Sequence, residues 1–136
     1  MNGAIAEKTS RLVDPADAVL VTGPPARFVS RGGDKLDAAL DAFGLDVTDR
    51  YALDAGASTG GFTDCLLQRG ARHVVALDVG HGQLHPKIRA DPRVTVLEHF
   101  NVRGLTAEHL DERPTIVVGD LSFISLTRVI PALVAV

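Results

Sequence analysis

A short apolar segment followed by a glycine-rich run is the feature that most constrains the fold of this chain. Residues 51–53 are apolar, Asp54 follows them, and small residues then lead into a helical pattern over 62–69. A strand–turn–helix of this kind lets the backbone approach a ligand closely, because glycine has no side chain and tolerates a positive φ. We therefore expect a ligand-binding loop made of Gly56, Ala57, Ser58, Thr59, Gly60, Gly61 and Phe62.

The spacing of the glycines excludes two common phosphate-binding loops. A Walker loop needs Gly-Lys-Ser/Thr at its end, and this run ends in Gly60-Gly61-Phe62. The dinucleotide fingerprint needs GxGxxG, whereas the first glycine here is Gly56 and the next is Gly60. The loop fits an uncharged or cationic adenosine-like ligand, for which S-adenosylmethionine is the leading candidate.

Strand-like and helix-like segments alternate along the chain. The predicted strands cover residues 51–53, 73–77, 94–97 and 115–118, and the predicted helices cover 35–43, 62–69, 87–90, 106–110 and 126–136. Such alternation predicts an α/β fold with a mainly parallel sheet and right-handed crossovers. The strands are continuous apolar runs, as expected when helices cover both faces of the sheet. Asp34 is the expected N-cap of the first helix, and Gly44 is the residue expected to follow its end.

Both ends of the chain suggest a fragment of a longer protein. Residues 1–6 and 18–21 are strand-like pieces ahead of a Gly/Pro linker, and two strands without a helix do not form a stable domain. At the other end, the apolar residues of 126–136 need a packing partner. We expect only the N-terminal half of a larger sheet. This chain alone should bind cofactor weakly or not at all, and it should be inactive by itself.

Composition and charge limit the classes of function that this chain could have. The chain has 136 residues, enough for one ordinary domain, and its net charge of −3 does not itself indicate nucleic-acid binding. There is no apolar run of transmembrane length and no signal peptide, so we expect a cytoplasmic protein without a membrane partner. Cys65 is expected to be an inert thiol, and the histidine spacing predicts no metal site.

Three acidic residues come at or just after the ends of predicted strands. In parallel α/β sheets, ligands bind outside the carboxyl ends of the strands, where Asp54, Asp78 and Asp120 would gather. Asp78 has the spacing of an acid that binds ribose hydroxyls, because a carboxylate accepts two hydrogen bonds at once. Structural alternatives stay open: Asp78 as a turn residue before Gly80, Asp54 as an anchor of the loop, and Asp120 as a helix cap.

Lys35 follows the unusual pair Gly32-Gly33, which indicates that the backbone there passes close to another group. Taken alone, a lysine in a first helical turn is usually a solvated charge. An acid at a strand end, such as Asp120, is a natural partner for a lysine or for a cationic sulfonium.

Four segments occur in an order and spacing that closely resembles the TlyA family, namely residues 30–36, 53–64, 101–103 and 119–126. These proteins are bacterial 2′-O-ribose methyltransferases of ribosomal RNA, often labelled haemolysin-like. They have an FtsJ-type, Rossmann-like class I methyltransferase domain behind an N-terminal S4 RNA-binding domain. The resemblance covers residues 28–136. It implies that residues 1–26 are the remnant of the S4 domain with its linker, and that 27–136 belong to the methyltransferase domain.

The resemblance also implies roles for individual residues. Lys35 and Asp120 match the first lysine and the aspartate of a Lys-Asp-Lys-Glu active site, whose second lysine and glutamate have no match in this chain. The loop 56–62 matches the S-adenosylmethionine loop, Asp78 the ribose-binding acid, and Asn101 a position that contacts the adenine. A lysine amine held near the ribose 2′-hydroxyl, partly buried and with its pKa lowered by its neighbours, would accept or steer the proton.

Three other functions remain open from the sequence. The chain could belong to a methyltransferase of a different acceptor, because the cofactor half of this fold does not specify the substrate. The family's haemolysin label suggests a membrane-active protein, but the sequence argues against it, with no spanning segment and no basic amphipathic helix. The chain could also be a nucleotide-binding module without catalysis. Lys35, with its glycine lead-in and paired with Asp120, favours an enzyme. The resemblance implies that its partners are ribosomal RNA and ribosomal subunits.

Overall fold

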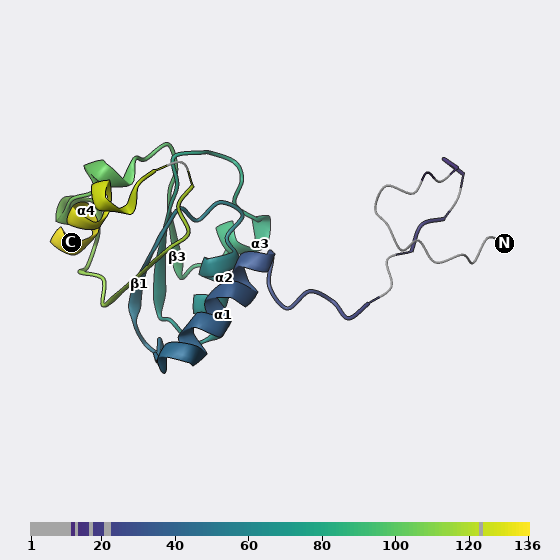
Figure 1. The fold of residues 1–136 in the computed structure, drawn as a ribbon, viewed down its shortest axis with the longest axis horizontal. Helices are drawn as coiled ribbons and strands as arrows, with labels where there is room; N and C mark the ends of the chain where they lie inside the picture. Colours follow the sequence, from purple (N-terminus) through teal and green to yellow (C-terminus); the bar gives the residue numbers. More distant parts are fainter. Residues whose placement is uncertain (1–11, 13, 17, 21–22, 123) are drawn as a thin grey trace.

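A four-stranded sheet forms the centre of the computed structural model, which describes residues 12, 14–16, 18–20, 23–122 and 124–136 (Figure 1). All strand pairs are parallel, and the strand order is β3-β2-β1-β4. The strands are β1 (Tyr51–Ala55), β2 (His73–Leu77), β3 (Val94–Leu97) and β4 (Ile116–Gly119). Because the strands are parallel, their carboxyl ends meet at one edge of the sheet. The prediction of a parallel α/β fold is therefore confirmed.

Helical segments cover both faces of the sheet (Figure 1). One face packs against α1 (Arg31–Phe43), α2 (Gly61–Gln68) and α3 (Pro86–Arg89), and the other against η1 (Val102–Gly104), η2 (Ala107–His109), η3 (Leu126–Arg128) and α4 (Ile130–Ala135). Successive residues of β1 alternate between the two cores: Ala52 faces the first, while Leu53 and Ala55 face the second. This double burial explains the continuous apolar strands.

The first helix begins earlier than the sequence indicates. Its N-cap is Ser30, in an extended conformation, so Asp34 lies in the first turn and the predicted Asp34 cap is wrong. Its end is as expected, because Gly44 adopts a left-handed conformation with φ of 62°. The early start places Lys35 on the second turn of α1, close to the carboxyl edge of the sheet.

Other boundaries differ by smaller amounts. Strand β1 extends to Ala55, so Asp54 lies inside the strand and does not follow it. The helix predicted over 106–110 is a single 3₁₀ turn, and the helix predicted over 126–136 is divided into η3 and α4. The extra turn η1 was not predicted.

Near the N-terminus, well-packed structure begins at residue 27. Residues 18–20 form no strand, so the strand prediction is wrong there, and residues 1–6 lie outside the described part of the chain. Arg27 pairs with Asp37, and its carbonyl accepts a hydrogen bond from Gln68. The ring of Phe28 is buried, and the Val29 amide donates to Asp64 at 2.9 Å. Residues 27–29 are thus fastened to α1 and α2.

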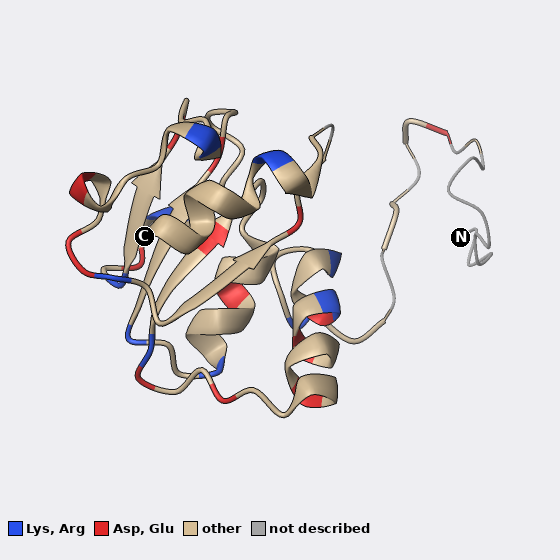
Figure 2. Cartoon of the chain, turned by 60° about the vertical axis from the view of Figure 1, so that its left-hand side comes forward, with Lys and Arg blue, Asp and Glu red and all other residues tan. Residues whose placement is uncertain are grey.

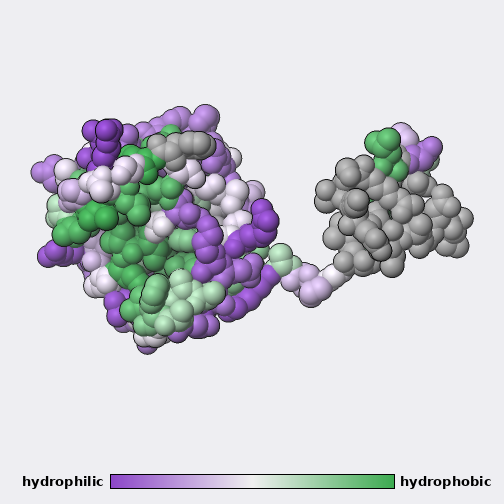
Figure 3. Space-filling model, in the orientation of Figure 1, coloured by the Kyte–Doolittle hydropathy of each residue, from purple (hydrophilic) through white to green (hydrophobic). Residues whose placement is uncertain are grey.

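Strand β4 forms an edge of the sheet with apolar surface beside it. Val117, Ile130 and Val134 are all substantially exposed there. Figure 3 shows that this apolar surface continues over β4 and α4. The ligand-binding features described below lie at a different place, along the carboxyl ends of the strands.

Candidate functional site

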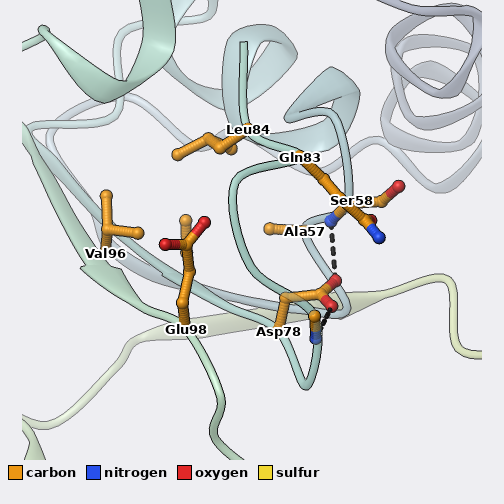
Figure 4. A pocket seen from close by; sticks show the side chains of 9 residues that line it. Ala57, Ser58, Asp78, Gln83, Leu84, Val96 and Glu98 are labelled. Atoms are coloured by element: carbon orange, nitrogen blue, oxygen red, sulfur yellow. Dashed lines mark hydrogen bonds between the residues drawn. The ribbon is translucent and has the colours of Figure 1, made fainter. Parts of the chain in front are cut away.

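A cleft of about 300 Å³ opens at the carboxyl edge of the sheet, between the ends of β1, β2 and β4. Its lining combines apolar groups with two carboxylates and comprises Gly56, Ser58, Leu77, Asp78, Val79, Gln83, Val102, Asp120, Leu121 and Ser122. A much smaller hollow of about 10 Å³ adjoins it beside β3 and includes Ala57, Leu84, Val96 and Glu98 (Figure 4). Ser58, Asp78 and Gln83 line both spaces.

The glycine-rich loop turns sharply beneath this cleft. Gly56 and Gly60 have φ values of 86° and 95°, which L-residues with side chains rarely adopt. The amides of Gly56 and Ala57 both donate to the carbonyl of Leu77, which ties the loop to β2. A Cβ at Gly56 would lie 2.8 Å from Leu121, so glycine lets the loop pass under the segment after β4.

Asp78 connects the glycine-rich loop with the turn after β2. Its Oδ2 accepts a hydrogen bond from the Ser58 amide at 2.8 Å, and its Oδ1 accepts one from the Gly80 amide at 2.7 Å (Figure 4). Asp78 is therefore a turn residue before Gly80, as one alternative held, and it also lines the cleft. Each carboxylate oxygen keeps a second lone pair, so the group can still accept hydrogen bonds from ligand hydroxyls.

Asp54 lies fully buried below the loop and lines neither space. Its Oδ2 accepts a hydrogen bond from the Thr63 hydroxyl at 2.7 Å, which links β1 to α2. Its Oδ1 has no hydrogen-bond partner among the described residues. Burial raises the pKa of this carboxyl to about 7, and the negative charges of Asp78 and Asp120 act in the same direction.

Lys35 and Asp120 form an ion pair that joins α1 to the end of β4, across 85 residues of sequence. Asp120 lines the cleft, so the ammonium group of Lys35 lies at the cleft margin. The Lys35 side chain is 63% exposed, and the partial burial that the sequence suggested is therefore wrong for this structure. An exposed pair of this kind adds little to stability.

The glycine pair before Lys35 has a structural explanation. A Cβ at Gly33 would collide with the buried Phe28 ring, and a Cβ at Gly61 would collide with Ser30 Oγ and lie 2.9 Å from the Gly33 amide nitrogen. The two glycine pairs thus allow the starts of α1 and α2 to touch. The sequence predicted that the backbone at Gly32-Gly33 passes close to another group. In the structure that group is a neighbouring part of the chain itself.

The remaining predicted site residues surround the cleft without lining it. The Thr59 carbonyl accepts a hydrogen bond from the His85 amide, and Gly60 and Gly61 form the start of α2. Phe62 lies over Gly32. Asn101 is exposed, and its side chain accepts a hydrogen bond from the Arg103 amide at 3.0 Å, which caps η1.

Several cleft residues were not predicted from the sequence. Gln83 comes from the loop after β2, Val102 from η1, and Leu121 and Ser122 from the segment after β4. Of these residues, only Leu121 and Ser122 could have been predicted from the sequence, because they directly follow Asp120 at a predicted strand end. Loop residues such as Gln83 carry no periodic pattern.

The described residues offer neither a metal-binding cluster nor an activated cysteine. No group of three or more His, Cys, Asp or Glu side chains in the described residues is placed to hold a metal ion. Cys65 is buried, and burial raises the pKa of its thiol to about 11, so it is not an activated nucleophile. The chemistry of the site therefore rests on the loop, the acids and Lys35.

Comparison with known families assigns the fold to a family. Residues 28–136 match the FtsJ-like methyltransferase family. The chain belongs to this family. The match begins at the position where the chain becomes fastened to α1 and α2, and it covers the loop, the cleft acids and Lys35.

Individual relatives agree with this assignment. The 16S/23S rRNA (cytidine-2'-O)-methyltransferase TlyA of Mycobacterium tuberculosis is 55% identical over 98% of this chain and 50% of its own length. This chain therefore spans about half the length of that relative. A solved structure from Streptococcus thermophilus, provisionally named a hemolysin, is 46% identical with a TM-score of 0.81, over 85% of this chain and 42% of the other. The resemblance to TlyA proteins is confirmed.

More distant structures support the fold alone. An S-adenosylmethionine dependent methyltransferase from Mesorhizobium loti superposes with a TM-score of 0.58 at 18% identity, over 72% of this chain and 46% of the other. The sheet is thus of the Rossmann-like methyltransferase type. None of the helices in the described part of the chain is long and apolar enough to cross a membrane.

Proposed function

We propose that this chain carries the cofactor-binding half and part of the catalytic set of an S-adenosylmethionine-dependent enzyme that methylates ribose 2′-hydroxyls of ribosomal RNA. The observation that carries the proposal is the Lys35–Asp120 pair at the margin of a cleft framed by the glycine-rich loop. Membership of the FtsJ-like family and 55% identity to an rRNA 2′-O-methyltransferase support the substrate class.

The cleft residues fit S-adenosylmethionine. The lining is largely apolar with two carboxylates, Asp78 and Asp120, which suits a ligand with an aromatic base, a diol and a cationic sulfonium. Asp78 would accept the ribose hydroxyls, and the backbone of Gly56 and Ser58 would lie against the ligand. Thr59 to Phe62 would hold the loop in shape, Asp54 would anchor it from below, and Asn101 would contact the adenine. The cofactor supplies a methyl group on a positively charged sulfur.

Lys35 would handle the proton of the attacking hydroxyl. A ribose 2′-hydroxyl is a weak nucleophile, and an amine within hydrogen-bond reach accepts or steers its proton as the oxygen attacks. Asp120 holds the Lys35 ammonium group at the cleft margin in the structure, so it would position that amine. The rest of the rate enhancement would come from alignment of the reacting atoms, which is mainly a proximity effect.

The domain division follows from the same proposal. Residues 27–136 would form the methyltransferase part, since packing begins at Arg27 and the family match begins at residue 28. Residues 1–26 would be the end of an S4 RNA-binding domain and its linker. The partners would be ribosomal RNA and ribosomal subunits in the cytoplasm, and the second lysine and the glutamate of the active site would come from outside this sequence.

Two arms of one experiment separate this proposal from its alternatives. Methyl transfer by the full-length protein from labelled S-adenosylmethionine is measured with ribosomal subunits, DNA and total protein as acceptors. Red-cell lysis is measured with the same preparation. We expect label in ribosomal RNA and no lysis. Label only in DNA or protein would support a different acceptor, and lysis without methyl transfer would support the haemolysin alternative that the provisional name of the Streptococcus relative suggests.

A further inference from the structure

Arginines at the amino-end edge of the sheet are held by other parts of the protein. Arg50, Arg72 and Arg93 each stand directly before a strand, at the start of β1, β2 and β3. Arg50 donates to the Thr115 carbonyl at 3.1 Å, Arg72 pairs with Glu112, and Arg93 pairs with Asp91 at 2.8 Å. The guanidinium groups of Arg27, Arg69, Arg89 and Arg113 also have partners. These arginines therefore have a structural role in the fold.

At the opposite, carboxyl-end edge of the sheet, the arginine side chains are not held by other described residues. Arg31, Arg103 and Arg128 are exposed, and within the described part of the chain no hydrogen bond or ion pair holds their guanidinium groups. Each follows or precedes, along the chain, a residue that lines or borders the cleft. Arg31 is four residues before Lys35 and so shares its face of α1, Arg103 follows the cleft residue Val102, and Arg128 lies in η3, in the segment after Ser122.

These segments lie on different faces of the sheet but meet at the same edge. The helix α1 covers one face, while η1 and η3 belong to the other. Figure 2 shows basic residues, in blue, on several of the helical segments around the sheet. Arg31, one helical turn from Lys35 on α1, and Arg103, next to the cleft residue Val102, therefore approach the cleft from opposite faces of the sheet, although the whole chain has a net charge of −3.

The charges inside the cleft and around it have opposite signs. Asp78 and Asp120 line the interior, where a phosphate group would be repelled. Guanidinium groups at the rim would attract phosphates, and their planar donors match phosphate oxygens in pairs. This separation suits a nucleic acid whose sugar hydroxyl points into the cleft while its backbone stays outside.

We propose that Arg31, Arg103 and Arg128 bind the phosphates on either side of the target ribose in single-stranded or looped RNA. The inference rests on the proposed function, because it takes the cleft as the place where the hydroxyl meets the cofactor. These arginines would position the substrate and would leave cofactor binding unchanged. Phosphate contacts of this kind set position and affinity without reading sequence.

The test compares two triple variants with the same change in charge. One carries Arg31→Gln, Arg103→Gln and Arg128→Gln, and the control carries Arg50→Gln, Arg72→Gln and Arg93→Gln at the opposite edge. Binding of a fluorescent RNA hairpin is measured by anisotropy over a series of salt concentrations. The slope of log K against log[salt] falls by about 0.7 for each single-strand phosphate contact that is lost. We expect the rim variant to lose about 2 in slope, and the control to keep the wild-type slope.

Further readouts make each outcome decisive. Calorimetry should give the same S-adenosylmethionine affinity for the wild type and for the triple variant at Arg31, Arg103 and Arg128. If the triple control variant unfolds, the single variants Arg103→Gln and Arg93→Gln repeat the RNA-binding comparison. Equal losses in both variants, or no loss in either, would overturn the inference and leave the proposed function standing. Binding of anionic phospholipid vesicles that depends on the same arginines, without RNA binding, would also overturn it. Absence of cofactor binding by the full-length wild-type protein would count against the proposed function itself.

Discussion

A single buried carboxyl group, that of Asp54, gives the protein an unusual pH dependence. In the folded state its pKa is raised to about 7, whereas an unfolded Asp titrates near 3.9. Between about pH 4 and pH 7 the folded state therefore binds more protons than the unfolded state, and stability falls as pH rises through this window. The carboxyls with lowered pKa, such as Asp46 and Asp91, act in the opposite direction and at lower pH.

We predict that Asp54→Asn flattens the loss of stability between about pH 5 and pH 7. The amide cannot ionise, and its oxygen can still accept the Thr63 hydrogen bond seen at 2.7 Å. Urea denaturation at several pH values measures the change, which should be on the order of a few kcal/mol. Asp46→Asn, at an exposed carboxyl, is the matched control and should keep the wild-type slope. An unchanged slope in Asp54→Asn would show that Asp54 is ionised in the fold.

Asp78 is predicted to recognise the hydroxyls of the cofactor ribose. Asp78→Ala should weaken S-adenosylmethionine binding by about 1–3 kcal/mol, the usual effect of removing charged hydrogen bonds. Part of that loss comes from the Ser58 and Gly80 amides, which also lose an acceptor. A cofactor analogue without ribose hydroxyls separates the two effects in calorimetry. An equal loss for both ligands would make Asp78 a loop anchor only.

Lys35 is predicted to act in turnover and not in cofactor binding. Lys35→Ala should keep cofactor affinity within a few fold and slow methyl transfer by about 10²–10⁴-fold, the usual contribution of a general base. Lys35→Arg should fail almost as badly, because a guanidinium group stays protonated. Lys87→Ala removes a lysine that pairs with Asp64 at 3.4 Å on the α3 side, and it serves as the control. Near-normal single-turnover rates in both Lys35 variants would contradict the assignment.

At the scale of elements, the contact between α1 and the segment before it decides where the helix starts. The sequence predicted Asp34 as the N-cap of a helix over 35–43, yet α1 begins at Arg31 and includes two glycines, which disfavour helix. Gly33 packs against Phe28, and Gly61 of α2 approaches Ser30 and Gly33. These tertiary contacts outweigh the low helix propensity of two glycines, and no local pattern predicts them.

Gly33→Ala tests this contact. Its Cβ would collide with the ring of Phe28, so we predict a loss of about 1–3 kcal/mol in the free energy of unfolding, as is typical of overpacking. Gly104→Ala is the matched control, because a Cβ there meets nothing within 4 Å. Denaturant midpoints of the two variants measure the difference. Equal stability would mean that α1 and residue 28 are not packed as described.

Elements with a strong apolar pattern were predicted well from the sequence. The bounds of β2 and β3 agree to the residue, because each is a continuous apolar run between polar residues. The ends of β1 and β4 were less well defined, because Asp54 and Gly119 resemble turn residues although both lie within strands. Sheet register and the neighbours of each strand decide such cases, and a single segment does not contain that information.

The same reasoning applies to the candidate site. Asp78, Asp120 and the loop at Gly56 and Ser58 were predicted because strand ends and glycines mark them, and they do meet in one cleft. The pairing of Lys35 with Asp120 across 85 residues was suggested by chemistry and by resemblance. Val102 and Gln83 were missed, since their place depends on how the loops after β3 and β2 fold back.

At the scale of the whole molecule, the two edges of the sheet have separate roles. The amino-end edge holds arginines in bonds that stabilise the fold, while the carboxyl edge holds the loop, the cleft acids and Lys35. Ligands bind at the carboxyl edge in sheets of this type. In the proposed function, cofactor, ribose hydroxyl and proton acceptor would therefore meet at this edge.

The position of the transferred methyl group tests this account most directly. Ribosomal subunits are incubated with the full-length protein and S-adenosylmethionine, and the RNA is digested to nucleosides for mass spectrometry. We predict a methyl group on a ribose 2′-oxygen, formed by the wild type and lost in Lys35→Ala. A methyl group on a base, or equal 2′-O-methylation by the Lys35→Ala variant, would contradict the account.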